Sequence, residues 1–165
     1  MAKRFNINAT TIATLTAVAA IVLGILDSRQ TRAHNRLSVA PYVVVDYSLS
    51  AQPEQASFTV HLSNEGVGPA IVDSVKILLP DSLGGGTFIN WRDVAELLRK
   101  RGATVPSYWN YRRGEALGVQ RSRELIRIIV PDSLQESLLT PLYDMDVRVE
   151  YRSIYHQQFE TGLKR

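Results

Sequence analysis

A run of twenty residues without a charged side chain, Ile7 to Leu26, places the strongest limit on what this chain can fold into. As an α-helix with a rise of 1.5 Å per residue, such a run is about 30 Å long, the thickness of the hydrocarbon core of a bilayer. We therefore predict a single transmembrane helix over about residues 7–26. A short tail precedes it, and a juxtamembrane linker follows it up to residue 36.

The alternatives to an uncleaved anchor are a cleavable signal peptide and a buried helix of a soluble protein. Lys3 and Arg4 would serve as the charged start of a signal peptide. The apolar run is longer than the usual apolar region of a signal peptide, and residues 27–32 offer no cleavage site with small residues at the required spacing. The pattern therefore favours the anchor.

The residues of this helix are unevenly distributed around its axis. At about 100° per residue, small side chains fall on one arc, and large apolar side chains cover the opposite side. Close approach of two helices in lipid depends on small residues at the contact, so the arc predicts a helix–helix interface. The alternative is that small residues are simply common in spanning helices. The predicted interface consists of Ala9, Ala13, Thr16, Ala17, Ala20 and Gly24.

The flanking charges leave the orientation in the membrane open. Lys3, Arg4 and the amino terminus precede the span, whereas Arg29, Arg32 and Arg36 follow it. The rule that Lys and Arg collect on the cytoplasmic side favours a cytoplasmic domain by a small margin. The chain has no cysteine, which fits a reduced compartment and equally a disulfide-free periplasmic domain. The net charge of +3 is ordinary beside anionic lipid and does not indicate a nucleic-acid partner.

Residues 37–165 have the length of one domain with a single core and carry mostly strand patterns. The clearest is residues 145–152, where Met145, Val147, Val149 and Tyr151 alternate with charged residues. Patterns typical of strands also occur at residues 42–49, 58–63, 70–79, 125–130 and 158–163. We predict a mainly β fold, an immunoglobulin-like β-sandwich behind the transmembrane helix.

One or two short helices interrupt the predicted strands. Asn90 is suited to the N-cap of a helix over residues 91–101, because Asp93 lies in its first turn and basic residues fill its last. A capping box from Ser133 to Glu136 predicts a second helix, which Pro141 would end.

No group of residues in the sequence forms a recognisable catalytic or metal site. His34, His61 and His156 are scattered, without cysteines or carboxylates at the spacing of metal ligands. The glycines at 84–86 lack the following Lys of a phosphate-binding loop, and the serines lack the context of a nucleophile. We expect a protein that is not an enzyme and has no catalytic, cofactor-binding or metal-binding residues.

A short aromatic and basic segment is the best candidate for a contact surface. Tyr, Trp and Arg are enriched where proteins bind proteins, so the segment predicts a contact with a protein or with lipid headgroups. The alternative is that the aromatic residues complete the core and the arginines are merely solvated. The same residue types can stack single-stranded nucleic acid, but the basic residues form no extended stripe. The candidate residues are Tyr108, Trp109, Tyr111, Arg112 and Arg113.

Two motifs give the chain a family resemblance. The stretch His34–Pro41 directly follows the predicted span, and the stretch Leu62–Ala70 reads Leu-Ser-Asn-Glu-Gly-Val-Gly-Pro-Ala. Together they resemble a group of uncharacterised bacterial single-pass membrane proteins with a β-sandwich, and the second stretch is also similar to fibronectin-like sandwiches. The resemblance implies the architecture and a place in the bacterial inner membrane, but no catalytic residue. In physical terms, Asn64 can bond its own turn, and Gly66 and Gly68 permit positive φ.

The functional hypothesis is a non-catalytic accessory or structural subunit of a larger membrane protein complex. Its partners would be the lipid bilayer and other membrane subunits. An energy-transducing complex, photosynthetic or respiratory, is one setting, although no residue specifies it. The alternative is a free-standing membrane-tethered receptor or sensor that binds a ligand or peptide, for example at a sheet edge.

Overall fold

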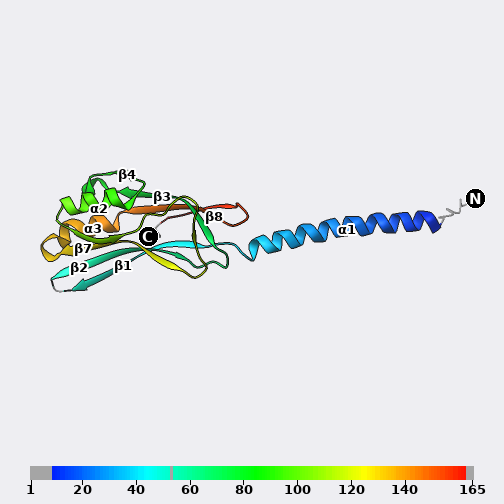
Figure 1. Cartoon of the computed structure of the whole chain (residues 1–165), viewed down its shortest axis with the longest axis horizontal. Helices are drawn as coiled ribbons and strands as arrows, with labels where there is room; N and C mark the ends of the chain where they lie inside the picture. The colour runs from blue at the N-terminus through cyan, green and yellow to red at the C-terminus, as the bar shows by residue number, and fades with distance from the viewer. Residues whose placement is uncertain (1–8, 53, 163–165) are drawn as a thin grey trace, which may run out of the picture. The chain divides into compact units, whose positions relative to one another are not determined.

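The computed structural model describes residues 9–52 and 54–162, which fall into an N-terminal unit up to Ser38 and a second unit from Val39 onward. Within the first unit, residues 9–37 form one helix, α1 (Ala9–Leu37), drawn in blue in Figure 1. Its segment Ile12–Asn35 is long and apolar enough to cross a membrane, with a mean hydropathy of 1.7 and no part of it buried. Residues 7 and 8 of the predicted span lie outside the described residues.

The residues that we predicted as a juxtamembrane linker continue the helix. No glycine or proline occurs between Gly24 and Pro41, so nothing in the sequence breaks the run of backbone hydrogen bonds. The N–H group of Ser38 still donates to the carbonyl of His34 at 2.9 Å, which closes the last turn.

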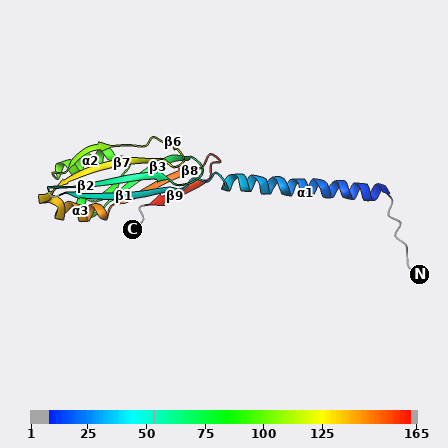
Figure 2. The same ribbon diagram turned by 90° about the horizontal axis from the view of Figure 1, so that it is seen from below.

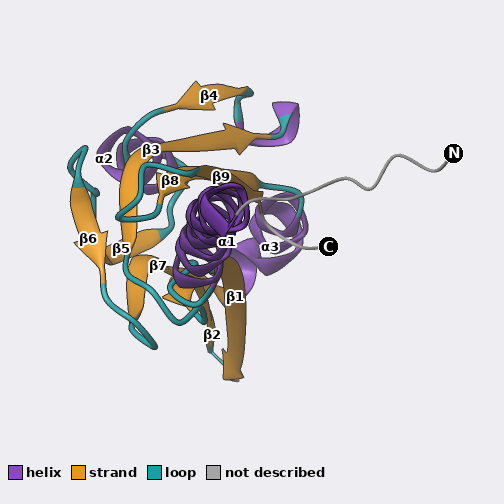
Figure 3. Cartoon of the chain, turned by 90° about the vertical axis from the view of Figure 1, so that its right-hand side faces the viewer, coloured by secondary structure: helices purple, strands orange, loops and turns teal. Residues whose placement is uncertain are grey.

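The second unit contains two antiparallel sheets that face one another, as the layers in Figures 1 and 3 show. The first sheet has the order β1 (Val43–Gln52), β2 (Gln55–Asn64), β7 (Ser122–Pro131) and β5 (Thr104–Tyr108). The second has the order β4 (Gly86–Phe88), β3 (Ala70–Leu79), β8 (Asp146–Arg152) and β9 (Gln158–Gly162), and β6 (Glu115–Leu117) pairs with β3.

The strand order confirms the predicted immunoglobulin-like β-sandwich. When the strands are lettered along the chain as in that fold, the order across the first sheet is A, B, E and D, and the order across the second is C′, C, F and G. The chain has no cysteine, so apolar packing rather than a disulfide joins the sheets. The inward side chains of β2 and β8, such as Phe58, Leu62 and Val147, are completely buried.

Two helices cover open parts of the sandwich. Helix α2 (Trp91–Lys100) contacts β4 and β5 and buries Trp91, Val94 and Leu98 along one face, as its sequence pattern predicts. Its N-cap is confirmed, because the side chain of Asn90 accepts a hydrogen bond from the N–H group of Asp93 at 3.0 Å. Helix α3 (Gln135–Tyr143) contacts β2 and β7 and lies at one end of the strands in Figure 2.

The start of α3 differs from the prediction. No side chain caps this helix, because a short 3-10 helix, η2 (Asp132–Leu134), includes Ser133 and Leu134, the first two residues of the expected capping box. Pro141 lies inside α3 instead of ending it. A proline in the last turn removes a single backbone hydrogen bond, and the helix ends at Tyr143. The same Pro-Asp-Ser-Leu sequence after β3 forms a second 3-10 helix, η1 (Asp81–Leu83), so it is a strand exit used twice.

Asn64 is a completely buried polar residue that joins three segments of the sandwich. Its side-chain oxygen accepts hydrogen bonds from the N–H groups of Tyr42 at 3.3 Å and Gly66 at 3.1 Å. Its amide nitrogen donates to the carbonyls of Gly68 at 2.8 Å and Leu117 at 3.1 Å. The side chain therefore fixes the lead-in to β1, the β2–β3 turn and the end of β6 at one point.

The reason for glycine at positions 66 and 68 differs from the one that we predicted. Neither residue has positive φ. A Cβ atom at Gly66 would lie 2.2 Å from the backbone nitrogen of Tyr42, and one at Gly68 would lie 1.8 Å from the carbonyl oxygen of Val39. Glycine is required because the turn packs against the backbone of residues 39–42. The two motifs of the family resemblance therefore contact each other at Val39–Tyr42.

Replacing Asn64 should destabilise the sandwich strongly. Asn64→Ala leaves buried N–H and C=O groups without partners, so we expect the free energy of unfolding to fall by about 3 kcal/mol. Urea denaturation of the full chain in detergent, followed by tryptophan fluorescence, measures this loss. Ser50→Ala, at an exposed position of β1, is the control and should change stability by less than about 0.5 kcal/mol. Equal losses in the two variants would contradict the role of Asn64.

Candidate functional site

The candidate contact residues lie on one segment that runs from one sheet to the other, which we call the aromatic loop (Tyr108–Arg113). At its start, the N–H group of Trp109 donates to the carbonyl of Leu125 on β7 at 2.7 Å. Directly after it, the N–H group of Gly114 donates to the carbonyl of Val72 on β3 at 2.8 Å. Gly114 has a φ of 85°, which favours glycine. Both ends of the loop are therefore fixed to the scaffold.

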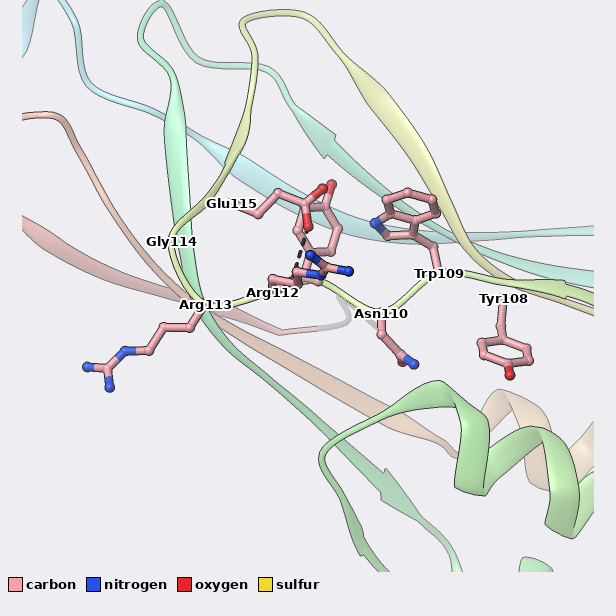
Figure 4. Close-up of a pocket in the computed structure, with 8 residues that line it drawn as sticks. Tyr108, Trp109, Asn110, Arg112, Arg113, Gly114 and Glu115 are labelled. Carbon is pink, nitrogen blue, oxygen red and sulfur yellow. Dashed lines mark hydrogen bonds between the residues drawn. The ribbon is translucent and has the colours of Figure 1, made fainter.

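The middle of the loop is fixed by helix α2. The side-chain oxygen of Asn110 accepts a hydrogen bond from the N–H group of Trp91, the first residue of the helix, at 2.6 Å. That N–H group has no partner within the helix, so Asn110 stabilises the helix end and the loop together. Figure 4 shows Trp109 on one side of the loop and Tyr108 on the other, toward the helix.

The aromatic loop lines an open hollow of about 760 Å³. All the predicted contact residues line it, and it also includes Asn110, Gly114 and Glu115 (Figure 4). The sequence analysis offered two roles for the aromatic residues, completion of the core or a contact surface, and the structure shows a different environment for each residue. Tyr108 and Tyr111 pack against the core, as a structural role requires, whereas 44% of Trp109 is exposed.

Arg123 holds the exposed tryptophan in place. Its guanidinium carbon lies 4.3 Å from the ring centre of Trp109 and 5.9 Å from that of Tyr111, both within the range of a cation–π interaction. Glu115 forms an ion pair with Arg123 at 2.8 Å and also accepts a hydrogen bond from the N–H group of Arg112 at 3.1 Å. Neither Arg123 nor Glu115 was predicted. Only the fold brings Arg123 on β7 beside the loop, whereas Glu115 directly follows the loop in the sequence and its pairing with Arg123 depends on the fold.

The two arginines of the loop differ from Arg123 in having no acidic partner. Arg112 and Arg113 are exposed, and neither forms an ion pair among the described residues. Arg113 also borders a second hollow of about 540 Å³ on the outer face of β8 and β9, lined by Asp73 and Glu150 among others. The loop thus presents an exposed indole ring next to two uncompensated positive charges.

Tyr111 has an unusual environment for a phenol. Its hydroxyl group is buried and has no hydrogen-bond partner among the described residues. Burial raises the pKa of Tyr111 to about 12, against an opposing effect of Arg123 and with a further contribution from Glu115. The phenol is therefore neutral at physiological pH, and the loop carries no negative charge of its own to balance Arg112 and Arg113.

Ser48, His61 and Glu124 lie near one another on the outer face of the first sheet, although the sequence did not connect them. The hydroxyl of Ser48 is 3.3 Å from Nε2 of His61, and His61 is the cross-strand neighbour of Glu124. The carboxylate of Glu124 already accepts hydrogen bonds from Ser107 at 2.6 Å and from Arg127. Burial opposes the shift, but these two hydrogen bonds and the electrostatic interactions with Arg127 and His61 lower the pKa of Glu124. Its two oxygens accept hydrogen bonds from Ser107 and Arg127, whereas the orienting acid of a catalytic triad accepts one from the histidine.

The described residues contain no group of three His, Cys, Asp or Glu side chains that could hold a metal ion.

The predicted helix–helix interface lies on an exposed side of α1. Ala13, Thr16, Ala17 and Ala20 are all exposed, and the hydroxyl of Thr16 donates to the carbonyl of Ile12 at 2.9 Å. The Thr16 hydroxyl is therefore satisfied within the helix. A Cβ atom at Gly24 would have no neighbour within 4 Å. The side chain of Ala9 lies outside the described part of the structure.

No protein-family model matches this chain, and a search of curated proteins found no match.

Replacing Arg123 should release Trp109. Without the guanidinium over its ring, the indole becomes more mobile, so Arg123→Gln should increase acrylamide quenching of its fluorescence and reduce stability by about 0.5–1 kcal/mol. Trp91 is 1% exposed and contributes little to quenching. Trp109→Phe identifies the quenchable signal, and Arg127→Gln removes another arginine from β7 as a control. Unchanged quenching in Arg123→Gln would contradict the stacked arrangement.

Tyr111 should make stability depend on pH in the alkaline range. Its folded-state pKa of about 12 exceeds the ordinary value of 10.0, so the unfolded chain ionises first. The stability from Tyr111 is therefore present below about pH 10 and is lost as the pH rises toward about 12. Between about pH 9 and pH 11 in urea denaturation, the wild type should lose more stability than Tyr111→Phe. Tyr155→Phe, at an exposed tyrosine, should follow the wild type; parallel curves for all three proteins would exclude the effect.

Proposed function

We propose that the protein is a non-catalytic accessory subunit of a larger membrane protein complex. In this proposal, α1 lies in the bilayer and packs against a helix of a partner subunit through its small residues. The aromatic loop of the sandwich makes a second contact outside the membrane. The single observation that carries the proposal is the fixed loop that exposes Trp109 beside two arginines without acidic partners.

The properties of α1 support the membrane part of the proposal. The large apolar side chains of the span are about half exposed or more, for example Leu15 at 64% and Ile21 at 63%. In water, such a surface is strongly unfavourable, at roughly 25 cal/mol for each Å² of apolar area. Lipid covers the large side chains well, whereas the small-residue side gains more from the close approach of another helix.

The aromatic loop supports the contact outside the membrane. Exposed tryptophan and arginine are the residue types that contribute most binding energy in protein interfaces. Three attachments, to β7, β3 and α2, hold the loop in one conformation, so a partner would not have to order it on binding. A partner would lose less conformational entropy to this loop than to a flexible one.

The alternative is a membrane-tethered receptor, and the open hollow of about 760 Å³ is the observation in its favour. The free edge of β1 is a poorer binding site for such a receptor. Along that edge, the N–H group of Val43 donates to the hydroxyl of Tyr151 at 3.3 Å, and the N–H group of Tyr47 donates to the carboxylate of Asp46 at 2.7 Å. A peptide that added to β1 would have to displace these acceptors, so a receptor would use the hollow.

Purification in mild detergent from the native membrane tests the proposal. We expect partner subunits in fixed stoichiometry with the wild type. Ala13→Leu/Ala17→Leu/Ala20→Leu should reduce their recovery by about tenfold or more, because bulky residues prevent close helix packing. Val18→Leu/Val22→Leu/Ile25→Leu changes the opposite face and is the matched control.

The same purification tests the aromatic loop. Trp109→Ala combined with Arg112→Gln and Arg113→Gln should weaken recovery of the partners, whereas Tyr155→Ala, which removes an aromatic residue of similar exposure, should not. Recovery of the wild type as a lone monomer would refute the subunit proposal and favour the receptor.

A further inference from the structure

Two arginines follow the apolar part of α1 at the depth of lipid headgroups. Because the helix continues past Leu26 without a break, Arg29 lies about 4–5 Å and Arg32 about 9 Å beyond that residue along the axis. The headgroup layer is roughly 5–7 Å thick on each side of the hydrocarbon core. Helical side chains point toward the N-terminus, here the direction of the bilayer, so both arginines lean back toward this layer.

Both arginines continue the large apolar face of the helix. Alternating steps of four and three residues place a series of side chains along one side of α1. All of these side chains are exposed. The series consists of Leu15, Val18, Val22, Ile25, Arg29 and Arg32. Asp27 lies about 140–160° away from the two arginines around the axis, on the side of the small residues.

The positive charges have no acidic neighbour on the helix. The positions three and four residues away from Arg29 and Arg32 hold no carboxylate, and neither residue forms an ion pair among the described residues. The two arginines are themselves three residues apart, so they repel each other. An external anion that contacts both would remove this repulsion.

The same spacing argues against a second copy of the helix on this face. A helix pair that met along Val18, Val22 and Ile25 would bring arginines of both copies together at the end of the contact. Lipid, by contrast, supplies hydrocarbon next to the apolar residues and phosphate next to the arginines. Charge complementarity therefore selects lipid as the occupant of this face.

We propose that Arg29 and Arg32 bind the headgroup phosphates of anionic phospholipids in the leaflet next to the sandwich domain. The guanidinium groups donate hydrogen bonds to phosphate oxygens, while the apolar side chains below them contact the acyl chains. This contact fixes which side of α1 faces lipid and leaves the small-residue side to a protein partner. The inference rests on the proposed membrane span.

Native mass spectrometry of the full chain, purified in detergent with equal amounts of phosphatidylglycerol and phosphatidylcholine, tests this binding. The wild type should retain phosphatidylglycerol preferentially, and Arg29→Gln/Arg32→Gln should lower that preference by about tenfold or more. Arg92→Gln/Lys100→Gln removes the same charge from exposed positions of α2 and should keep the preference. A variant that adds Thr31→Arg and Asn35→Arg to Arg29→Gln/Arg32→Gln moves the charge to another face and should not restore it.

An equal loss of preference in Arg92→Gln/Lys100→Gln, or full restoration by the relocated arginines, would show that net charge alone attracts the lipid and would overturn the inference. Retention of each protein in membranes after an alkaline wash reports on the span separately. If the wild type is washed off, the membrane part of the proposed function fails. If it stays and shows no preference for phosphatidylglycerol, only the lipid site fails.

Discussion

The buried side chain of Asn64 is the interaction on which the arrangement of the candidate site depends. Its amide group bonds the lead-in to β1, the turn before β3 and the carbonyl groups at the end of β6. The position of β6 in turn sets where the chain leaves the aromatic loop. Because a buried amide without partners is costly, loss of any one of these bonds weakens the arrangement. The turn next to Asn64 also approaches residues 39–42 so closely that neither Gly66 nor Gly68 has room for a Cβ atom.

The aromatic loop shows how a rigid surface can arise between two sheets. A loop attached to one sheet alone could move relative to the other sheet. Here the backbone bonds to Leu125 and Val72 attach it to both sheets, and Asn110 attaches it to α2. Arg123 then fixes the exposed indole ring from the neighbouring strand. The fixed position of the exposed indole ring therefore depends on contacts between segments far apart in the sequence, as well as on the residue types of the loop.

This distinction explains what the sequence could predict. Long strands with one buried face, such as β8, and helix α2 with its Asn90 cap are visible in local patterns, because burial imposes a period on them. The strands β4 and β6 have three residues each, too few for a period, and β5 contains Pro106, which argues against a strand; none of the three was predicted. The composition of the aromatic loop marked it as a candidate surface. Its partner Arg123 was not predictable, because no local pattern places β7 beside the loop. Glu115 is close in the sequence, but only the fold gives it Arg123 as an ion-pair partner.

The distribution of charge around the aromatic loop limits the kind of partner that could cover it. A surface that buried Trp109 would also remove water from Arg123, which tolerates this because Glu115 already neutralises it at 2.8 Å. Arg112 and Arg113 have no such partner among the described residues, so they would need carboxylate or carbonyl oxygens from the other protein. A partner with an apolar centre opposite Trp109 and acidic residues at its rim satisfies both demands. A wholly apolar surface would leave two charges buried without compensation.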